Sequence, residues 1–291
     1  SRTATGGLRR RADEMRRLTT RPTWAPVAAA SSVSYYLDAT AATIENPISV
    51  GGEWELSLDT TNFPTGGRIA TMNSGPKGIV GHTGSSFNDD VSRLSGSQWL
   101  PNQCVIVTIY NSGASLGNYE HELHTNSSSL NSSDQRCYAL ATVILASMQL
   151  SKWTGPFREI GSSTKGPIIL RTQVAIPGGA LVTGDKMGMI TTGPAELRRT
   201  RCFVRRSGES GPDDGIGPND DVVLDFTDDG TNDGSAGGDA PENRDPDADG
   251  TPTNNTAPLT TGNPGLGFDN SFTEVLNAGF TDYRAVTTPL G

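Results

Sequence analysis

The chain contains no run of 18 or more apolar residues, so a conventional membrane-spanning helix is excluded. Aromatic residues make up 6% and apolar residues 34% of the 291 positions, and histidine and cysteine occur three times each. The sequence has no P-loop, GxSxG, HExxH or CxxC motif, which argues against nucleotide-binding, serine-hydrolase and zinc-dependent classes. By contrast, 35 glycines and 18 prolines predict a turn-rich chain with little helix.

The net charge of −9 conceals two segments of opposite sign. Residues 1–21 are rich in arginine, whereas residues 209–250 are strongly acidic. We expect residues 1–30 to form a basic arm and linker, either a disordered tail or an arm that orders when it docks on a partner. The side chains expected to make that docking contact are Arg9, Arg10, Arg11, Met15, Arg16, Arg17 and Leu18.

From residue 31 onward, short runs with high β propensity alternate with turns rich in Gly, Pro and Asn, which predicts an all-β sandwich or barrel over residues 31–291. The expected strands are 33–37, 53–58, 68–72, 105–110, 119–124, 137–146, 148–153, 167–175 and 201–205. Residues 207–258 interrupt this rhythm. They are expected to form an acidic Gly/Asp-rich loop insertion containing one short strand at 222–226.

The three cysteines allow two interpretations. Cys104 and Cys137 both lie in expected strands and could pair if those strands were adjacent. Alternatively Cys104, Cys137 and Cys202 are three small buried apolar residues, which is the preferred interpretation because an odd number argues against a complete disulfide framework.

Several passages, taken in their order along the chain, carry a resemblance to a known family. They are residues 46–54, 118–124 with 138–142, 148–161 leading into 168–175 and 178–182, and the closing runs 259–268 and 280–285. Together they resemble the concanavalin-A-like, laminin-G-like jelly-roll domains of bacteriophage and gene-transfer-agent surface, fibre and decoration proteins. The resemblance implies a two-sheet jelly-roll sandwich whose closing strands bring the C-terminus back beside the first strand.

Glu120, Glu122 and His124 alternate along one expected strand and therefore share one face of the sheet. Two carboxylates about 5 Å apart can act as nucleophile and acid/base in retaining glycosidases, but the spacing here departs from the enzyme motif of the resembled fold. Hydrogen bonding to a glycan is the preferred functional interpretation, with Trp153 as an exposed stacking partner. The structural alternative is a set of solvated acids, or acids paired with Arg171 or Lys152.

The acidic segment contains the start of a calcium loop. Asp245, Asp247 and Asp249 stand at positions 1, 3 and 5 with Gly250 at position 6, although the Glu expected at position 12 is replaced by Thr256. Further ligands for a calcium cofactor could come from Asp228, Asp229 and Asp233. The alternative is a solvated acidic linker that holds no ion.

The resemblance, together with the basic arm, implies a structural protein of a virus particle, most simply a phage decoration, head-fibre or tail-fibre protein at the virion surface. The arm would dock on capsid or other virion subunits, and the lectin-like domain would face outward toward host-surface glycans. A homo-oligomer such as a trimer is the expected assembly, with no membrane contact and no nucleic-acid partner. A carbohydrate-binding module, or less favourably a glycoside hydrolase, is the alternative to this non-enzymatic role.

Overall fold

The computed structural model divides the chain into two units, Ser1–Ser31 and Ser32–Gly291. The residues that it describes all lie in the second unit: 33–38, 53–56, 69–71, 78–81, 88–96, 99–111, 119–128, 136–154, 168–231, 257–270 and 278–288. The proposed docking residues of the arm therefore lie outside the described residues. Within the described ranges, no helix has the length and apolar character needed to cross a membrane.

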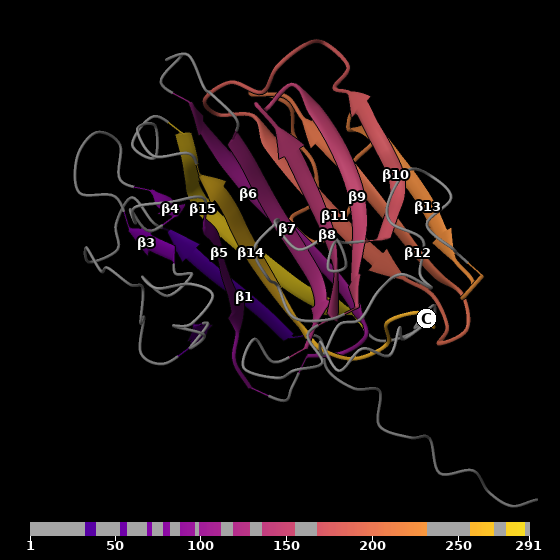
Figure 1. Ribbon diagram of the computed structural model, residues 1–291. Coiled ribbons are helices and arrows are strands. Elements are labelled where there is room, and N and C mark those ends of the chain that lie inside the picture. The colour runs from indigo at the N-terminus through magenta and orange to yellow at the C-terminus, as the bar shows by residue number, and fades with distance from the viewer. Residues whose placement is uncertain are drawn as a thin grey trace, which may run out of the picture. The chain divides into compact units, whose positions relative to one another are not determined.

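Two antiparallel sheets lie face to face (Figure 1). The first sheet has eight strands in the order β13-β12-β11-β6-β15-β4-β3, with β1 also paired to β15. Its strands are β1 (Val33–Asp38), β3 (Ile69–Thr71), β4 (Ile79–Gly81), β6 (Asn102–Asn111), β11 (Lys186–Thr192), β12 (Arg198–Arg205), β13 (Asp221–Asp228) and β15 (Ala278–Thr288).

The second sheet has seven strands in the order β10-β9-β8-β7-β14-β5-β2. Its strands are β2 (Trp54–Leu56), β5 (Asn88–Leu94), β7 (Tyr119–Ser127), β8 (Arg136–Val143), β9 (Ser147–Thr154), β10 (Ile168–Ala175) and β14 (Asn263–Asn270). The chain crosses repeatedly between the sheets, and its last two strands, β14 and β15, each enter the middle of one sheet. The expected all-β jelly-roll sandwich is therefore confirmed.

Alternate residues along the central strands form the core between the sheets. In β6, for example, Val105, Val107 and Ile109 point inward, and in β8 Tyr138 and Leu140 face them from the second sheet. These side chains belong to one continuous buried cluster. Burial on this scale is the main source of stability for a sandwich held by pairings distant in sequence.

The closing pair behaves as the resemblance implied. β1 pairs with β15 along its full length, from Val33 opposite Thr287 to Asp38 opposite Asp282, so the first and last described strands lie side by side (Figure 1). On the other edge of β15, the register with β6 places Asp282 opposite Thr108. The Asp282 carboxylate accepts hydrogen bonds from the Thr108 backbone N–H and hydroxyl, both at 2.9 Å.

The first half of the expected acidic insertion is part of the sandwich, and the short strand expected at 222–226 lies within β13 (Asp221–Asp228). Residues 207–220 are followed by β13, the edge strand of the first sheet. Arg205 on β12 fixes this segment through an ion pair with Asp220 at 2.7 Å, in which both side chains are almost fully buried. It also donates to the carbonyl oxygens of Pro212 and Gly215. The segment is thus anchored by a buried guanidinium.

A second, smaller apolar cluster lies on the outer face of the first sheet. It consists of Cys104, Ile106 and Phe203, with Ile190 and Ile216 packed against it. Ile216 belongs to the 207–220 segment, so that segment helps to cover this face. An apolar outer surface explains how an acidic, glycine-rich stretch can still pack.

All three cysteines are free and buried. Cys104 lies on the outer face of the first sheet and Cys137 on the outer face of the second, so the two cannot form the disulfide that the sequence left open. The interpretation as small buried apolar residues is confirmed.

Candidate functional site

The register of β7 confirms that Glu120, Glu122 and His124 share one face, the outer face of the second sheet. On this row Glu122 lies opposite Gly267 and Ala141, while His124 lies opposite Gly265 and Ala139. The neighbouring strands therefore present glycine or alanine beside both polar side chains. This leaves a floor of small residues around Glu122 and His124.

Glu122 and His124 are buried, and they interact with each other. The Nε2 of His124 lies 2.8 Å from the Oε2 of Glu122, and the two residues are 0% and 7% exposed. Burial lowers the pKa of His124 to about 3, so a neutral ring donates its Nε2–H to the carboxylate. Glu120 is half-buried. Oε2 of Glu122 is thus already engaged by the buried imidazole, a poor starting point for binding a sugar hydroxyl.

Trp153 is not exposed, which corrects the expectation that its indole could stack on a sugar. It is 6% exposed and packs in a small cluster with Val91, Cys137 and Ala139. The physical reason is its position on β9, a strand with neighbours on both edges. The structure brings Trp153 to the same face as Glu122, but as packing.

The expected calcium ligands are only partly described, and one is already engaged elsewhere. Asp228 points between the sheets and contacts Lys152 and Tyr138, so its assignment as a calcium ligand is corrected. The Asp229 carboxylate accepts hydrogen bonds from the backbone N–H and hydroxyl of Thr231. Asp233, Asp245, Asp247 and Asp249 lie outside the described residues. Among the residues described, no group of three or more His, Cys, Asp or Glu could hold a metal ion.

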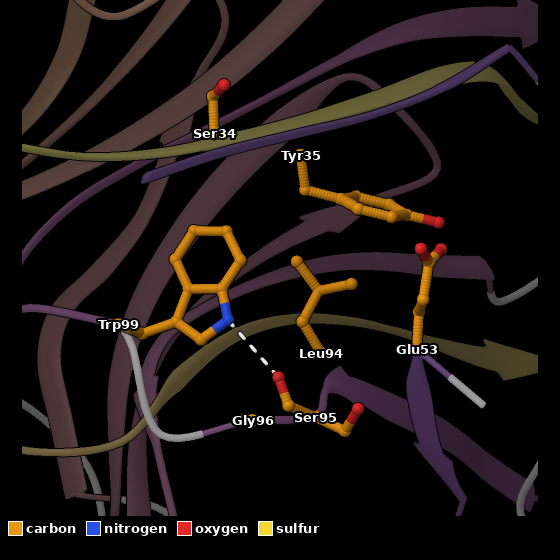
Figure 2. Close-up of a pocket in the computed structure, with 7 residues that line it drawn as sticks. All are labelled: Ser34, Tyr35, Glu53, Leu94, Ser95, Gly96 and Trp99. Atoms are coloured by element: carbon orange, nitrogen blue, oxygen red, sulfur yellow. Dashed lines mark hydrogen bonds between the residues drawn. The ribbon is translucent and has the colours of Figure 1, made fainter. Parts of the chain in front are cut away.

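A cleft of about 330 Å³ lies where the start of β1 meets the ends of β2 and β5, between the two sheets. Its lining residues, drawn in Figure 2, are Ser34, Tyr35, Glu53, Leu94, Ser95, Gly96 and Trp99. The Trp99 indole stands on one side of Leu94, and the Tyr35 phenol and Glu53 carboxylate stand on the other (Figure 2). Trp99 is half-buried and Glu53 is exposed. The cleft therefore combines an accessible ring with a solvated carboxylate.

Hydrogen bonds hold the two walls of the cleft in place. The Trp99 Nε1–H donates to the Ser95 carbonyl oxygen at 3.3 Å, which fixes the plane of the indole (Figure 2). On the opposite wall, the Trp54 Nε1–H donates to the Tyr35 hydroxyl at 3.1 Å. Burial raises the pKa of Tyr35, and the nearby Glu53 carboxylate, which is hydrogen-bonded to it, acts in the same direction. The phenol is therefore a neutral donor directed toward Glu53.

This arrangement has the chemistry of a sugar subsite. An oriented indole offers an apolar face for the C–H groups of a pyranose, and a carboxylate with neighbouring hydroxyl groups can accept and donate to its hydroxyls. Among the described residues that line the cleft, Glu53 is the sole carboxylate, whereas glycoside hydrolysis ordinarily uses two. The described part of the cleft therefore offers one ring for stacking and one carboxylate for hydrogen bonding.

Sequence reasoning proposed Trp153 as the stacking residue and did not assemble the cleft around Trp99. Tyr35 comes from the first sheet, whereas Glu53 and Leu94 come from the end of the second. Only the crossing of the chain between sheets brings them together. The available signal was an aromatic residue close to a glycine-containing turn at 95–96, which is common to many packed positions.

No family model matches the chain, and no curated protein sequence does. Solved structures that it is similar to include lectin II from Ulex europaeus, with a TM-score of 0.34, and a lectin described as UEA-II complexed with galactose, with a TM-score of 0.35. Each is 8% identical over 89% of this chain and 99% of the matched chain. At that identity the likeness concerns the arrangement of strands, and the site has to be judged from this chain's own side chains.

Proposed function

We propose that the sandwich is a non-enzymatic, carbohydrate-binding domain and that the cleft beside Trp99 holds the sugar. The observation that carries this proposal is the fixed, half-buried indole of Trp99 facing Glu53 and Tyr35 across about 330 Å³ of open space. A cavity of that size accommodates one or two pyranose rings. The lectin-like fold favours the same class of ligand.

The side chains that line the cleft indicate which class of sugar it would bind. One apolar ring and one carboxylate favour a neutral pyranoside with one face of C–H groups and at least two adjacent hydroxyl groups. A sialylated or sulfated sugar would place its negative charge against Glu53, at an energetic cost. We therefore expect neutral glycans to bind better than acidic ones.

Glycan binding by the full-length protein tests this directly. The unmodified protein is applied to an array of neutral and acidic glycans, together with Trp99→Ala, Glu53→Gln and the control Glu196→Gln, which alters an exposed acid in the β11–β12 turn. Loss of one stacking ring should weaken binding about tenfold. Glu196→Gln should bind normally. Absence of binding by the unmodified protein, or equal binding by Trp99→Ala, would refute the assignment.

We further propose that this domain is displayed on a virus particle and docked by residues 1–30. The support is the family resemblance of the sequence and the cluster of arginines in the arm. Calcium in residues 245–250 and a homo-oligomeric assembly remain part of the same proposal. Deleting residues 1–30 should abolish incorporation into particles while glycan binding is retained. Incorporation of the truncated chain at the normal level would contradict the docking role.

A further inference from the structure

A polar contact crosses the interior of the sandwich and joins its two sheets. Lys152 on β9 and Tyr138 on β8 project inward from the second sheet, and Asp228 on β13 projects inward from the first. Lys152 is 1% exposed, and Tyr138 and Asp228 are 0% exposed. The Lys152 Nζ lies 2.7 Å from the Asp228 Oδ2. An amine and a carboxyl group therefore touch in a site from which water is excluded.

The two oxygens of Asp228 have different surroundings. Oδ2 contacts the Lys152 amine and accepts a hydrogen bond from the Tyr138 hydroxyl at 2.6 Å. Oδ1 accepts a hydrogen bond from the backbone N–H of Gly230 at 3.1 Å. The Tyr138 hydroxyl in turn accepts the Leu259 N–H at 2.9 Å. The carboxyl group is thus held with one oxygen beside the amine and a phenol, and the other on a backbone donor.

We propose that Lys152 and Asp228 are joined by an intramolecular amide bond between Nζ and Cγ. The Lys152 ammonium first gives a proton to Oδ2, which leaves a neutral amine beside a neutral carboxylic acid. The Nζ lone pair then attacks Cγ, and the negative charge moves to Oδ1, where the Gly230 N–H stabilises it. Oδ2 takes a second proton from Nζ and leaves as water. One C–N bond forms, one C–O bond breaks, and no oxidant or other reactant is required.

The environment supports each part of this step. Burial disfavours the charged form of Lys152, so the neutral amine that can react is more accessible here than in water. Burial lowers the pKa of Lys152, although Asp228 opposes that effect. Burial and the neighbouring Asp228 raise the pKa of Tyr138, which keeps its proton on the hydroxyl and available to the departing oxygen. Tyr138 acts here as a positioning residue, because its hydroxyl holds Oδ2 by a hydrogen bond while both protons of the departing water come from Nζ.

A second deeply buried ion pair among the described residues, Arg205–Asp220, provides an internal comparison. Its atoms approach equally closely, at 2.7 Å, and both side chains are almost fully buried. A guanidinium keeps its proton under all ordinary conditions and is not a nucleophile, so this pair remains ionic. Only the lysine pair can convert into a covalent bond.

The amide would serve the chain as a substitute for a disulfide. All three cysteines are free, and Cys104 and Cys137 lie on opposite outer faces of the sandwich. A bond from β9 to β13 would link the two sheets near their shared edge, where β13 has a strand partner on one side only. In the unfolded chain it would keep residues 152 and 228 together, which reduces the conformational entropy of that state and thereby stabilises the fold.

Intact-mass spectrometry of the denatured full-length protein decides the proposal without any variant. The amide makes the chain lighter by the mass of one water molecule. After trypsin digestion, residues 137–158 and 207–244 should appear as one branched peptide, because an acylated Lys152 is not cleaved. A protein of full calculated mass, with separate 137–152 and 207–244 peptides, would overturn it.

Dehydration of an Asp-Gly step gives the same mass change, and two controls separate the outcomes. Hydroxylamine cleaves the chain at such a succinimide, whereas a side-chain amide survives. Lys152→Arg should restore the full mass, and Tyr138→Phe should slow the appearance of the lighter species in freshly made protein. The Lys152–Asp228 bond would be refuted if the mass loss persisted in Lys152→Arg, or if hydroxylamine cleaved the lighter species.

Discussion

Acidification should destabilise this protein through His121, a neutral imidazole enclosed in the core. The side chain is 0% exposed, and its ring centroid lies 5.4 Å from that of Phe268 and 5.5 Å from that of Phe280. Burial lowers the pKa of His121 to about 4, although a backbone hydrogen bond with Ala278 opposes this shift. Protonation would place a positive charge among aromatic rings, and folding therefore disfavours it.

The direction of the effect follows from the two pKa values. The folded-state pKa, about 4, lies below the ordinary value of 6.5, so the unfolded chain takes up the proton first as the pH falls. The contribution of the neutral ring is complete above pH 6.5 and is lost progressively between 6.5 and about 4. At about 1.4 kcal/mol per pH unit, the full loss is roughly 3 kcal/mol.

Urea unfolding followed by tryptophan fluorescence at about pH 7.5 and about pH 4.5 measures this loss. Between the two conditions the unmodified protein should lose about 2–3 kcal/mol more stability than His121→Gln, because the variant has no imidazole to protonate. His124 and the carboxylates are present in both proteins and cancel. Phe268→Leu serves as the control, since it weakens the same cluster at both pH values alike. Equal pH dependence of the unmodified protein and His121→Gln would refute the reasoning.

Three further predictions concern the packing of the sandwich. Arg205→Ala should lower the free energy of unfolding by about 3–5 kcal/mol and expose residues 207–220 to protease, because it leaves Asp220 buried without its cation. The control is Arg199→Ala, which removes the cation of the exposed Arg199–Asp225 pair and should change urea unfolding little. Equal effects of the two substitutions would contradict the distinction between buried and exposed pairs. Gly188→Ala should lower the free energy of unfolding in urea by about 1–3 kcal/mol, because a Cβ there would overlap the ring of Phe203. An unchanged urea midpoint would be inconsistent with that contact. The cysteines should resist a thiol reagent until urea unfolds the chain, since burial raises the pKa of Cys104 to about 12; rapid labelling of the folded protein would disagree.

Strands with strong β propensity and clear turn boundaries could be predicted from the sequence. The expected run 105–110 is the centre of β6, and 148–153 is the centre of β9. β5 was missed because its sequence, NDDVSRL, begins with three polar residues, and β11 because KMGMITT carries a glycine at its third position. In both cases the partner strands determine the structure: β5 pairs with β2 and β14, and the ring of Phe203 occupies the space above Gly188.

In the candidate sites, too, local features could be predicted from the sequence, whereas burial and long-range contacts could not. Period-2 alternation correctly placed Glu122 and His124 on one face, because side-chain direction in a strand is a local property. Their burial was not predictable, since it depends on β7 lying between β8 and β14 in the middle of its sheet. The contact of Lys152 with Asp228 joins residues 76 apart on different sheets. No local pattern encodes such a contact, and a charged residue in a strand ordinarily predicts a solvated face.

The cleft and the core share one aromatic group, which connects ligand binding with stability. Tyr35 lines the cleft and also packs edge-on against Trp54, with 5.8 Å between ring centroids, while Trp54 lies 5.1 Å from Tyr283 in the core. A sugar that contacts Tyr35 would therefore rest on a rigid stack that extends into the interior. Since the cleft is assembled from both sheets, its ligand binds the folded chain alone and must raise the unfolding temperature, by an amount that grows with the logarithm of ligand concentration above the dissociation constant. A glycan that binds without raising the unfolding temperature would have to be held elsewhere on the chain, and Trp99→Ala would leave its affinity unchanged.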